Sequence, residues 1–332
     1  GERVSLHGAW LTQPYEPGLR NRLRAVLGGQ GAIAEVGEAL TEAHVGVVRA
    51  LLAEARLAPK DIAVIGFHGH TILHRPDERR TWQIGDGALL ARRTGIDVVC
   101  DFRSADVAAG GQGAPFVPLY HAALAASLET PLAVLNLGGV GNVTWIGGGH
   151  RIIAFDTGPG NALIDDWLLR HTGQGFDQGG QMAASGRIDA GRLATMLDSR
   201  YFDRPPPKSL DRDDFSAAAV EGLSLADGAA TLTAFTARAV GRAREHLPQP
   251  PRRWLVTGGG RHNETLMALI AEAVEAPVVP VEAAGWRGDA LEAEAFAFLA
   301  VRSLAGLPLS LPSTTGVPRP MPGGRLFRKP AA

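Results

Sequence analysis

The stretch that most constrains this chain is residues 152–167, IIAFDTGPGNALIDDW. Its apolar positions follow the period of a buried strand up to Phe155 and the spacing of a helix from Leu163 onward. The Gly/Pro turn at 157–160 separates the two periods, so the pattern predicts a strand, a loop and a helix. In open α/β sheets, ligands bind at such junctions. We therefore expect Asp156 at the strand tip, facing a ligand.

The small residues of this turn indicate what kind of ligand it would accept. Gly158 and Gly160 let the backbone approach a ligand closely, and Asn161 can cap the new helix. The N–H groups at a helix N-terminus favour anionic oxygens. The structural alternative is a tight turn with an exposed acid, and the other loops of the chain decide between the two.

The length and the net charge of the chain limit the number of domains and the kinds of partner that we expect. With 332 residues, 45% of them apolar, the chain is long enough for two domains. Its 33 Lys and Arg nearly balance 34 Asp and Glu, which gives no electrostatic support for nucleic acid or an anionic membrane as partner. No apolar run is long enough to span a bilayer, the start carries no signal-peptide pattern, and there is one cysteine. We expect a cytoplasmic protein with a small ligand.

We predict a domain boundary at the polar break 129–131, which gives a first domain at 1–129 and a second at 130–332. The Pro/Gly-rich tail from Pro308 is expected to return to the first domain. The first domain should open with a strand at Arg3–Leu11, and helical spacing predicts a helix at 40–55.

A predicted strand at 61–67 runs into HGHTILH, where His68 and His70 would share one face. Together with His74 they are candidate zinc ligands, although histidines at a strand end are also common scaffold or substrate contacts. Further strands are predicted at 81–86 and 97–102. Gly85 and Asp86 end the first of these strands, and Arg103 and Asp106 follow the second, before a glycine-rich loop at 110–113.

The second domain should begin with a hairpin, 132–137 and 142–146, whose turn is Gly138–Gly141. It has neither the Gly-Lys-Ser/Thr ending of a P-loop nor the helix of a dinucleotide fold, but backbone N–H groups at its tip can still hold a phosphate. A strand ending in three glycines, WLVTGGG, follows at 254–260. The segments 138–141, 157–160 and 258–260 are thus expected along one edge of one sheet. The Pro-rich segment 205–216 looks too irregular for the core.

Eight motifs, in unbroken order from about Asp61 to Gly316, resemble the anhydro-N-acetylmuramic acid kinase family: HGHT, WQIGD, DFRSADVAAGGQGAPFVP, NLGGVGN, DTGPGN, PPKS, GGGRHN and DALEAEAFA. The resemblance implies an α/β fold of two actin-like (ribonuclease H-like) domains around an ATP cleft. It also implies a kinase that uses MgATP and water to open the 1,6-anhydro ring of the sugar and phosphorylate O6. The product would be N-acetylmuramic acid 6-phosphate, in peptidoglycan recycling.

The resemblance also implies roles for individual residues. Asp156 matches the family's catalytic base, and Glu292 matches a second functional acid. The alternative for Glu292 is a structural role, as an acid that the helix dipole favours at a helix N-terminus. Gln83, Asp86, Arg103 and Asp106 would contact the sugar, or else stabilise their loops. The nucleotide-binding positions would be Gly138, Gly139, Asn142, Gly158, Gly160, Asn161, Gly258, Gly259 and Gly260.

One departure concerns the start of the chain. Family members begin with a phosphate-binding hairpin close to GxMSGTSxDGxD, which the sequence as given lacks, so we interpret the first domain as N-terminally incomplete. The alternatives are an inactive actin-like sugar-binding protein, another N-acetylhexosamine kinase, and a zinc hydrolase built on His68 and His70. A homodimer is one possible assembly.

Overall fold

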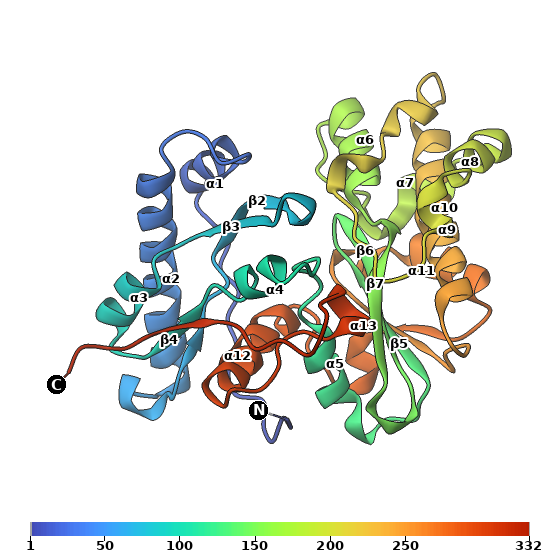
Figure 1. Ribbon diagram of the computed structural model, residues 1–332. Helices are drawn as coiled ribbons and strands as arrows, with labels where there is room; N and C mark the ends of the chain where they lie inside the picture. The colour runs from blue at the N-terminus through green and yellow to red at the C-terminus, as the bar shows by residue number, and fades with distance from the viewer. Residues whose placement is uncertain (1, 332) are drawn as a thin grey trace. The chain divides into compact units, whose positions relative to one another are not determined.

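The computed structural model describes residues 2–331 (Figure 1). The chain divides into two compact units, of which unit 2 is Ala125–Asp289 and unit 1 holds the chain before and after it. We expected a boundary at 129/130, with 130–332 as the second domain and only the tail from Pro308 returning to the first. The contacts instead group the chain from Ala290 onward, including its last long helix, with unit 1.

Unit 1 contains a three-stranded sheet of order β1-β4-β10 and a separate hairpin of β2 and β3. β1 and β4 are parallel, and β10, from the end of the chain, pairs antiparallel with β4. Its strands and helices are α1 (Pro17–Ala25), α2 (Ile33–Ala55), β1 (Ile65–Gly66), β2 (His70–Arg75), β3 (Arg80–Ile84), α3 (Gly87–Thr94), β4 (Val98–Cys100), α4 (Ser104–Ala108), α5 (Pro118–Leu124), α12 (Leu291–Leu304), α13 (Pro312–Thr315) and β10 (Arg325–Phe327).

The central strand β4 holds the core of unit 1, because it is buried on both faces. On one side Val99 packs with Phe296 and Leu299 of α12, and on the other Val98 packs with Val45 of α2 and Leu90 of α3. A run of β-branched residues suits such a strand. These layers fix the ends of β1 and β4, after which His68 and Arg103 follow.

Unit 2 has a five-stranded sheet of order β7-β6-β5-β8-β9. β5, β6 and β7 form an antiparallel meander, and β8 and β9 continue it in parallel. This arrangement agrees with the ribonuclease H-like domain that we expected. Its strands and helices are β5 (Leu132–Leu137), β6 (Val140–Ile146), β7 (Ile152–Pro159), α6 (Ala162–Thr172), α7 (Gln181–Ser185), α8 (Ala190–Leu197), α9 (Arg200–Asp203), α10 (Leu225–Ala243), β8 (Trp254–Thr257), α11 (Glu264–Val274) and β9 (Val278–Pro280).

The long helix α10 is the centre of unit 2. Phe235 lies in one apolar cluster with Trp167 of α6 and Phe202 of α9, whereas Val240 lies in a second cluster with Phe155 and with Ile270 of α11. α10 therefore joins the sheet to the helices around it and holds the turns at the strand ends in place (Figure 1).

Two predictions of local structure were wrong. Arg3–Leu11 forms no strand, and Leu6 is 85% exposed. Alternating residues form a strand only where a neighbouring edge supplies hydrogen bonds, and no strand of the described residues pairs with this segment. At the 157–160 turn, β7 instead continues to Pro159 because Val140 and Gly141 of β6 pair with Pro159 and Gly158.

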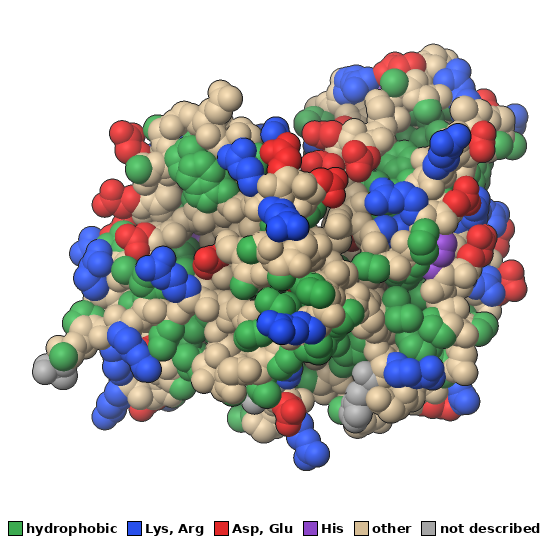
Figure 2. All heavy atoms as spheres, in the orientation of Figure 1, with side chains coloured by type: hydrophobic (Ala, Val, Ile, Leu, Met, Phe, Trp, Pro, Cys, Tyr) green, Lys and Arg blue, Asp and Glu red, His purple; other side chains and the backbone are tan. Residues whose placement is uncertain are grey.

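Basic and acidic side chains are interspersed on the face drawn in Figure 2, as the near-zero net charge leads one to expect. Among the described residues, no helix is both long and apolar enough to cross a membrane.

Candidate active site

The three glycine segments of unit 2 meet, as the sequence pattern predicted. The amide of Asn161 donates to the carbonyl of Gly138 at 2.7 Å, and the amide of Gly160 donates to that of Gly139 at 2.9 Å. The Asn161 side chain donates from Nδ2 to the carbonyl of Leu137 at 2.8 Å. These bonds attach the β5–β6 turn to the start of α6. We call this contact the glycine cluster, and it also includes 258–260.

Glycine is required here for space. A Cβ at Gly160 would lie 2.3 Å from the Gly138 carbonyl oxygen, and one at Gly260 would lie 2.6 Å from Leu137 Cβ. Gly258 has a φ of +78°, and a Cβ there would lie 2.6 Å from the Leu137 carbonyl oxygen. Gly259 has only ordinary neighbours. Bare backbone is therefore what lets three segments converge, as a phosphate cradle needs.

Gly158 has a different reason for being glycine. Its φ is +151°, and a Cβ would lie 2.8 Å from Cβ of Ala239 on α10. Gly158 thus allows β7 to pack closely against α10, which is a structural role and does not by itself indicate a ligand.

Asp156 lies within β7 and not at its tip, because the strand continues to Pro159. Its cross-strand neighbour is Asn142 of β6, beside a register shift between Gly141 and Asn142. One carboxylate oxygen, Oδ2, accepts a hydrogen bond from the amide of Leu210 at 2.9 Å. Asp156 and Asn142 are half-buried, so the sheet holds the acid beside the glycine cluster and leaves it partly accessible.

A pocket of about 360 Å³ adjoins the glycine cluster in unit 2, and Asn161, Gly259 and Gly260 line it. Its lining also includes Asp165, Phe176 and His262, which the sequence pattern did not indicate. Burial, with the neighbouring Asp166 carboxylate, raises the pKa of Asp165 to about 6. Asp165 stands one helical turn after Asn161, and this i,i+4 spacing was the available signal.

Unit 1 has its own pocket, of about 340 Å³, which Gln83, Asp86 and His68 line. Gln83 donates from Nε2 to the hydroxyls of Thr81, at 2.8 Å, and Thr71, at 3.2 Å. Oδ1 of Asp86 accepts a hydrogen bond from the amide of Leu89, so Asp86 caps the N-terminus of α3. This is the loop-stabilising role that was the alternative to a sugar contact. Both side chains still line the pocket.

Arg103 contacts a histidine, a backbone carbonyl and an aromatic ring. Its Nε donates to Nε2 of His68 at 2.9 Å, another guanidinium nitrogen donates to the carbonyl of Gly113, and the group lies 5.6 Å from the ring centre of Phe116. His68 Nδ1 lies 3.0 Å from the Gly69 carbonyl, which can only accept, so the proton is on Nδ1 and Nε2 is the acceptor. Burial and Arg103 lower the pKa of His68 to about 3.

This arrangement does not favour the zinc alternative. Nε2 of His68 faces a guanidinium, and His74 bonds Thr81 and the carbonyl of Gln112 through its two nitrogens. Among residues 2–331, no three His, Cys, Asp or Glu side chains come together to hold a metal ion.

The remaining two candidates differ in accessibility. Asp106 is 2% exposed, and its oxygens accept from the Gly113 amide at 2.7 Å and from the Thr315 hydroxyl at 2.6 Å. It is placed to anchor the 106–113 loop. Glu292 lies exposed in the first turn of α12, in unit 1. Asp106 and Glu292 belong to unit 1, whereas Asp156 belongs to unit 2.

Comparison with known proteins gives the family. The model of the anhydro-N-acetylmuramic acid kinase family matches residues 2–329. The anhydro-N-acetylmuramic acid kinase of Paramagnetospirillum magneticum is 59% identical over 98% of this chain and 92% of that protein. That of Rhodospirillum rubrum is 56% identical over 100% of this chain and 89% of that protein. Among solved structures, xylulose kinase from Rhodospirillum rubrum matches 66% of this chain and 48% of that one, at a TM-score of 0.38 and 14% identity, too low to bear on the argument. The chain belongs to the anhydro-N-acetylmuramic acid kinase family.

Proposed function

We propose that this chain is an ATP-dependent kinase that adds water to the 1,6-anhydro ring of 1,6-anhydro-N-acetylmuramic acid and phosphorylates O6. The product is N-acetylmuramic acid 6-phosphate. The observation that carries this proposal is the place of Asp156: a partly accessible carboxylate, fixed by the Leu210 amide, in the strand that runs into the glycine cluster. Because the reaction consumes ATP, we expect it in the cytoplasm.

The glycine cluster is the proposed phosphate site of unit 2. The segments at Gly138–Gly139, Gly160–Asn161 and Gly258–Gly260 meet mainly through glycine backbone, so backbone groups can approach phosphate oxygens. The adjoining pocket, which Gly259, Asp165 and Phe176 line, is the proposed nucleoside site. MgATP, when bound there, would supply the γ-phosphoryl group, with Mg²⁺ neutralising charge on the phosphate oxygens.

The proposed role of Asp156 is general base. An ionised carboxylate can only accept hydrogen bonds, so it orients water and takes a proton as the water attacks the anomeric carbon. The bond from C1 to O6 then breaks, and the electron pair stays on O6. That oxygen attacks the γ-phosphorus as the bond from this phosphorus to the β–γ bridging oxygen breaks and ADP leaves. One proton transfer thus starts both halves of the reaction. Asn142, across from Asp156, is proposed to contact the nucleotide.

The sugar contacts are proposed for unit 1. Gln83 and Asp86 line its pocket and offer a donor and an acceptor for hydroxyl or acetamido groups. The forked guanidinium of Arg103 suits the lactyl carboxylate. Asp106 would act through its loop, since both its oxygens are bonded. Glu292, at the exposed start of α12, is proposed as the second functional acid.

The test is Asp156→Asn, which keeps the side-chain shape and removes the base. We expect kcat to fall by roughly 10² to 10⁴ while affinities for ATP and sugar stay within about threefold. Glu54→Gln, which changes an exposed acid on α2 in the same chemical way, is the control. Wild-type turnover by Asp156→Asn would contradict the proposal. Faster phosphorylation of N-acetylglucosamine than of the anhydro sugar by the wild type would favour an ordinary N-acetylhexosamine kinase.

A further inference from the structure

Lys208 is a buried cation in a segment that we expected on the surface. It belongs to the Pro-rich stretch 205–216, yet it is 4% exposed. Burying an ammonium costs free energy unless its protons are bonded, so its position needs an explanation. Nothing in the proposed chemistry uses Lys208 directly.

The segment around Lys208 holds Asp156 at several points. The Tyr201 hydroxyl donates to the carbonyl of Asp156 at 2.6 Å, and the amide of Asp156 donates to the carbonyl of Lys208 at 3.0 Å. The amide of Leu210 donates to the Asp156 carboxylate at 2.9 Å. Residues 201–210 therefore fix both the backbone and one carboxylate oxygen of the proposed base.

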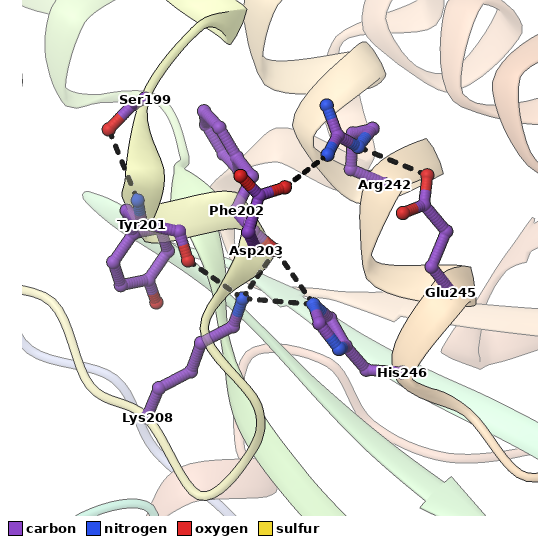
Figure 3. A network of polar contacts seen from close by, with 8 residues as sticks. All are labelled: Ser199, Tyr201, Phe202, Asp203, Lys208, Arg242, Glu245 and His246. Atoms are coloured by element: carbon purple, nitrogen blue, oxygen red, sulfur yellow. Dashed lines mark hydrogen bonds and ion pairs between the residues drawn. The ribbon is translucent and has the colours of Figure 1, made fainter.

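Lys208 closes this segment on itself (Figure 3). Its Nζ donates to the carbonyls of Tyr201, at 3.0 Å, and Phe202, at 3.1 Å, inside α9, and lies 4.7 Å from the ring centre of Tyr201. The Tyr201 carbonyl also accepts from the amide of Arg204, at 3.2 Å, so the ammonium is a second donor to that oxygen. Nε2 of His246 lies 2.7 Å from the Phe202 carbonyl, so it carries the proton and donates there too. The ammonium thus ties α9 to the strand-facing residues 208–210.

No acid among residues 2–331 forms an ion pair with Lys208. Asp203 and Glu245 form ion pairs with Arg242, at 2.7 and 3.0 Å, and not with Lys208 (Figure 3). Burial and the nearby Arg204 together lower the pKa of Lys208 to about 8, although Asp203 and Glu245 act in the opposite direction. Its bonds to the carbonyls are therefore charge-assisted below that pH and weaker above it.

We propose that Lys208 is a positioning residue for Asp156: by tying α9 to residues 208–210, it keeps the Tyr201 hydroxyl and the Leu210 amide on the base. The inference rests on the proposed role of Asp156. A base held loosely by about 1 Å loses orientation toward its water, which can cost on the order of 10² in rate. Substrate affinity should change little, because Lys208 contacts no proposed ligand residue.

The test compares Lys208→Met, which keeps the length of the side chain, with Lys60→Met, an exposed lysine in unit 1. We expect Lys208→Met to lower kcat by roughly 10- to 100-fold, with KM for ATP and sugar within about threefold. The wild-type kcat should also fall as the pH rises through 8, and this alkaline fall should be absent from Lys208→Met. Lys60→Met should keep the wild-type kcat and pH profile.

Tyr201→Phe keeps the proposal testable if Lys208→Met does not fold, as judged by near-UV circular dichroism. It removes only the hydroxyl that bonds Asp156, and we expect a fall in kcat of about three- to tenfold at unchanged KM. An unchanged kcat in either folded variant, or the same alkaline fall in Lys208→Met, would overturn the inference. If Asp156→Asn is inactive in the same assays, the proposed function stands nonetheless; if Asp156→Asn is active, the proposed function itself fails.

Discussion

Replacing Gly160 with Ala tests the glycine cluster. The added Cβ would lie 2.3 Å from the Gly138 carbonyl oxygen and 3.1 Å from the Gly141 amide nitrogen. An ordinary contact needs about 3.5 Å, so the β5–β6 turn must move away by roughly 1 Å. The obstacle is backbone on both sides, so no side chain can rotate out of the way. The conformation of Gly160 itself is not the cause, because its φ is not positive.

The free-energy cost follows from the bonds that such a movement breaks. The bond from the Asn161 amide to Gly138, now 2.7 Å, and that from the Gly160 amide to Gly139, now 2.9 Å, would both exceed hydrogen-bonding distance. Each is worth about 1 kcal/mol, and overpacking adds about 1–3 kcal/mol. Because these terms overlap, we expect a loss of roughly 2–4 kcal/mol in the free energy of unfolding. A domain of ordinary stability stays folded after such a loss.

The assay is urea unfolding together with calorimetry of MgATP binding, with Gly148→Ala as the control because it has open space around it. Gly160→Ala should lower the unfolding free energy and weaken MgATP binding at least tenfold, about 1.4 kcal/mol. Gly148→Ala should change neither. Wild-type stability and MgATP affinity in Gly160→Ala would refute the idea that close backbone contact builds the phosphate site.

Two further predictions concern buried groups. Arg261 donates to the Gly258 carbonyl at 2.9 Å, whereas its ion-pair partners Glu282 and Asp289 are about half exposed, so those pairs contribute little stability. Arg261→Met should therefore weaken MgATP binding about three- to tenfold and leave KM for the sugar unchanged. Equal MgATP affinity of the variant and the wild type by calorimetry would show that the Gly258 carbonyl does not need this hydrogen bond. The pKa of His68 is lowered from 6.5 to about 3, so the stability it contributes is fully present above pH 6.5 and is lost as the pH falls toward 3. The urea midpoint should therefore drop between pH 7 and pH 5, and by less in His68→Gln; equal drops in the two proteins would contradict the neutral His68.

The sequence predicted most of unit 2 and the meeting of its glycine segments. A strand followed by glycines occurs at 137–138 and again at 257–258, and strands β5 and β8 proved to be parallel neighbours. Parallel neighbours end at the same edge of a sheet, so the loops after them had to lie together. The shift from strand to helix after Asp156 was also visible, although β7 runs further than its apolar residues indicated.

What the sequence could not predict depends on contacts between distant segments. The stretch 205–216 reads as a polar loop, and nothing in its composition shows that Lys208 would be buried under α9. Asp106 was expected to contact the sugar because of the family resemblance, but Thr315, 209 residues away, donates to its second oxygen. Arg3–Leu11 alternates like a strand, and no neighbouring strand of the described residues pairs with it.

The central claim is that one proton transfer to Asp156 starts both ring opening and phosphorylation. The most direct measurement is turnover of the anhydro sugar and MgATP in ¹⁸O-labelled water, followed by mass spectrometry of the sugar phosphate and of inorganic phosphate. The account predicts the label at C1 of the product and none in its phosphoryl group. Label in phosphate instead would mean that water attacks phosphorus, and the role assigned to Asp156 would be wrong.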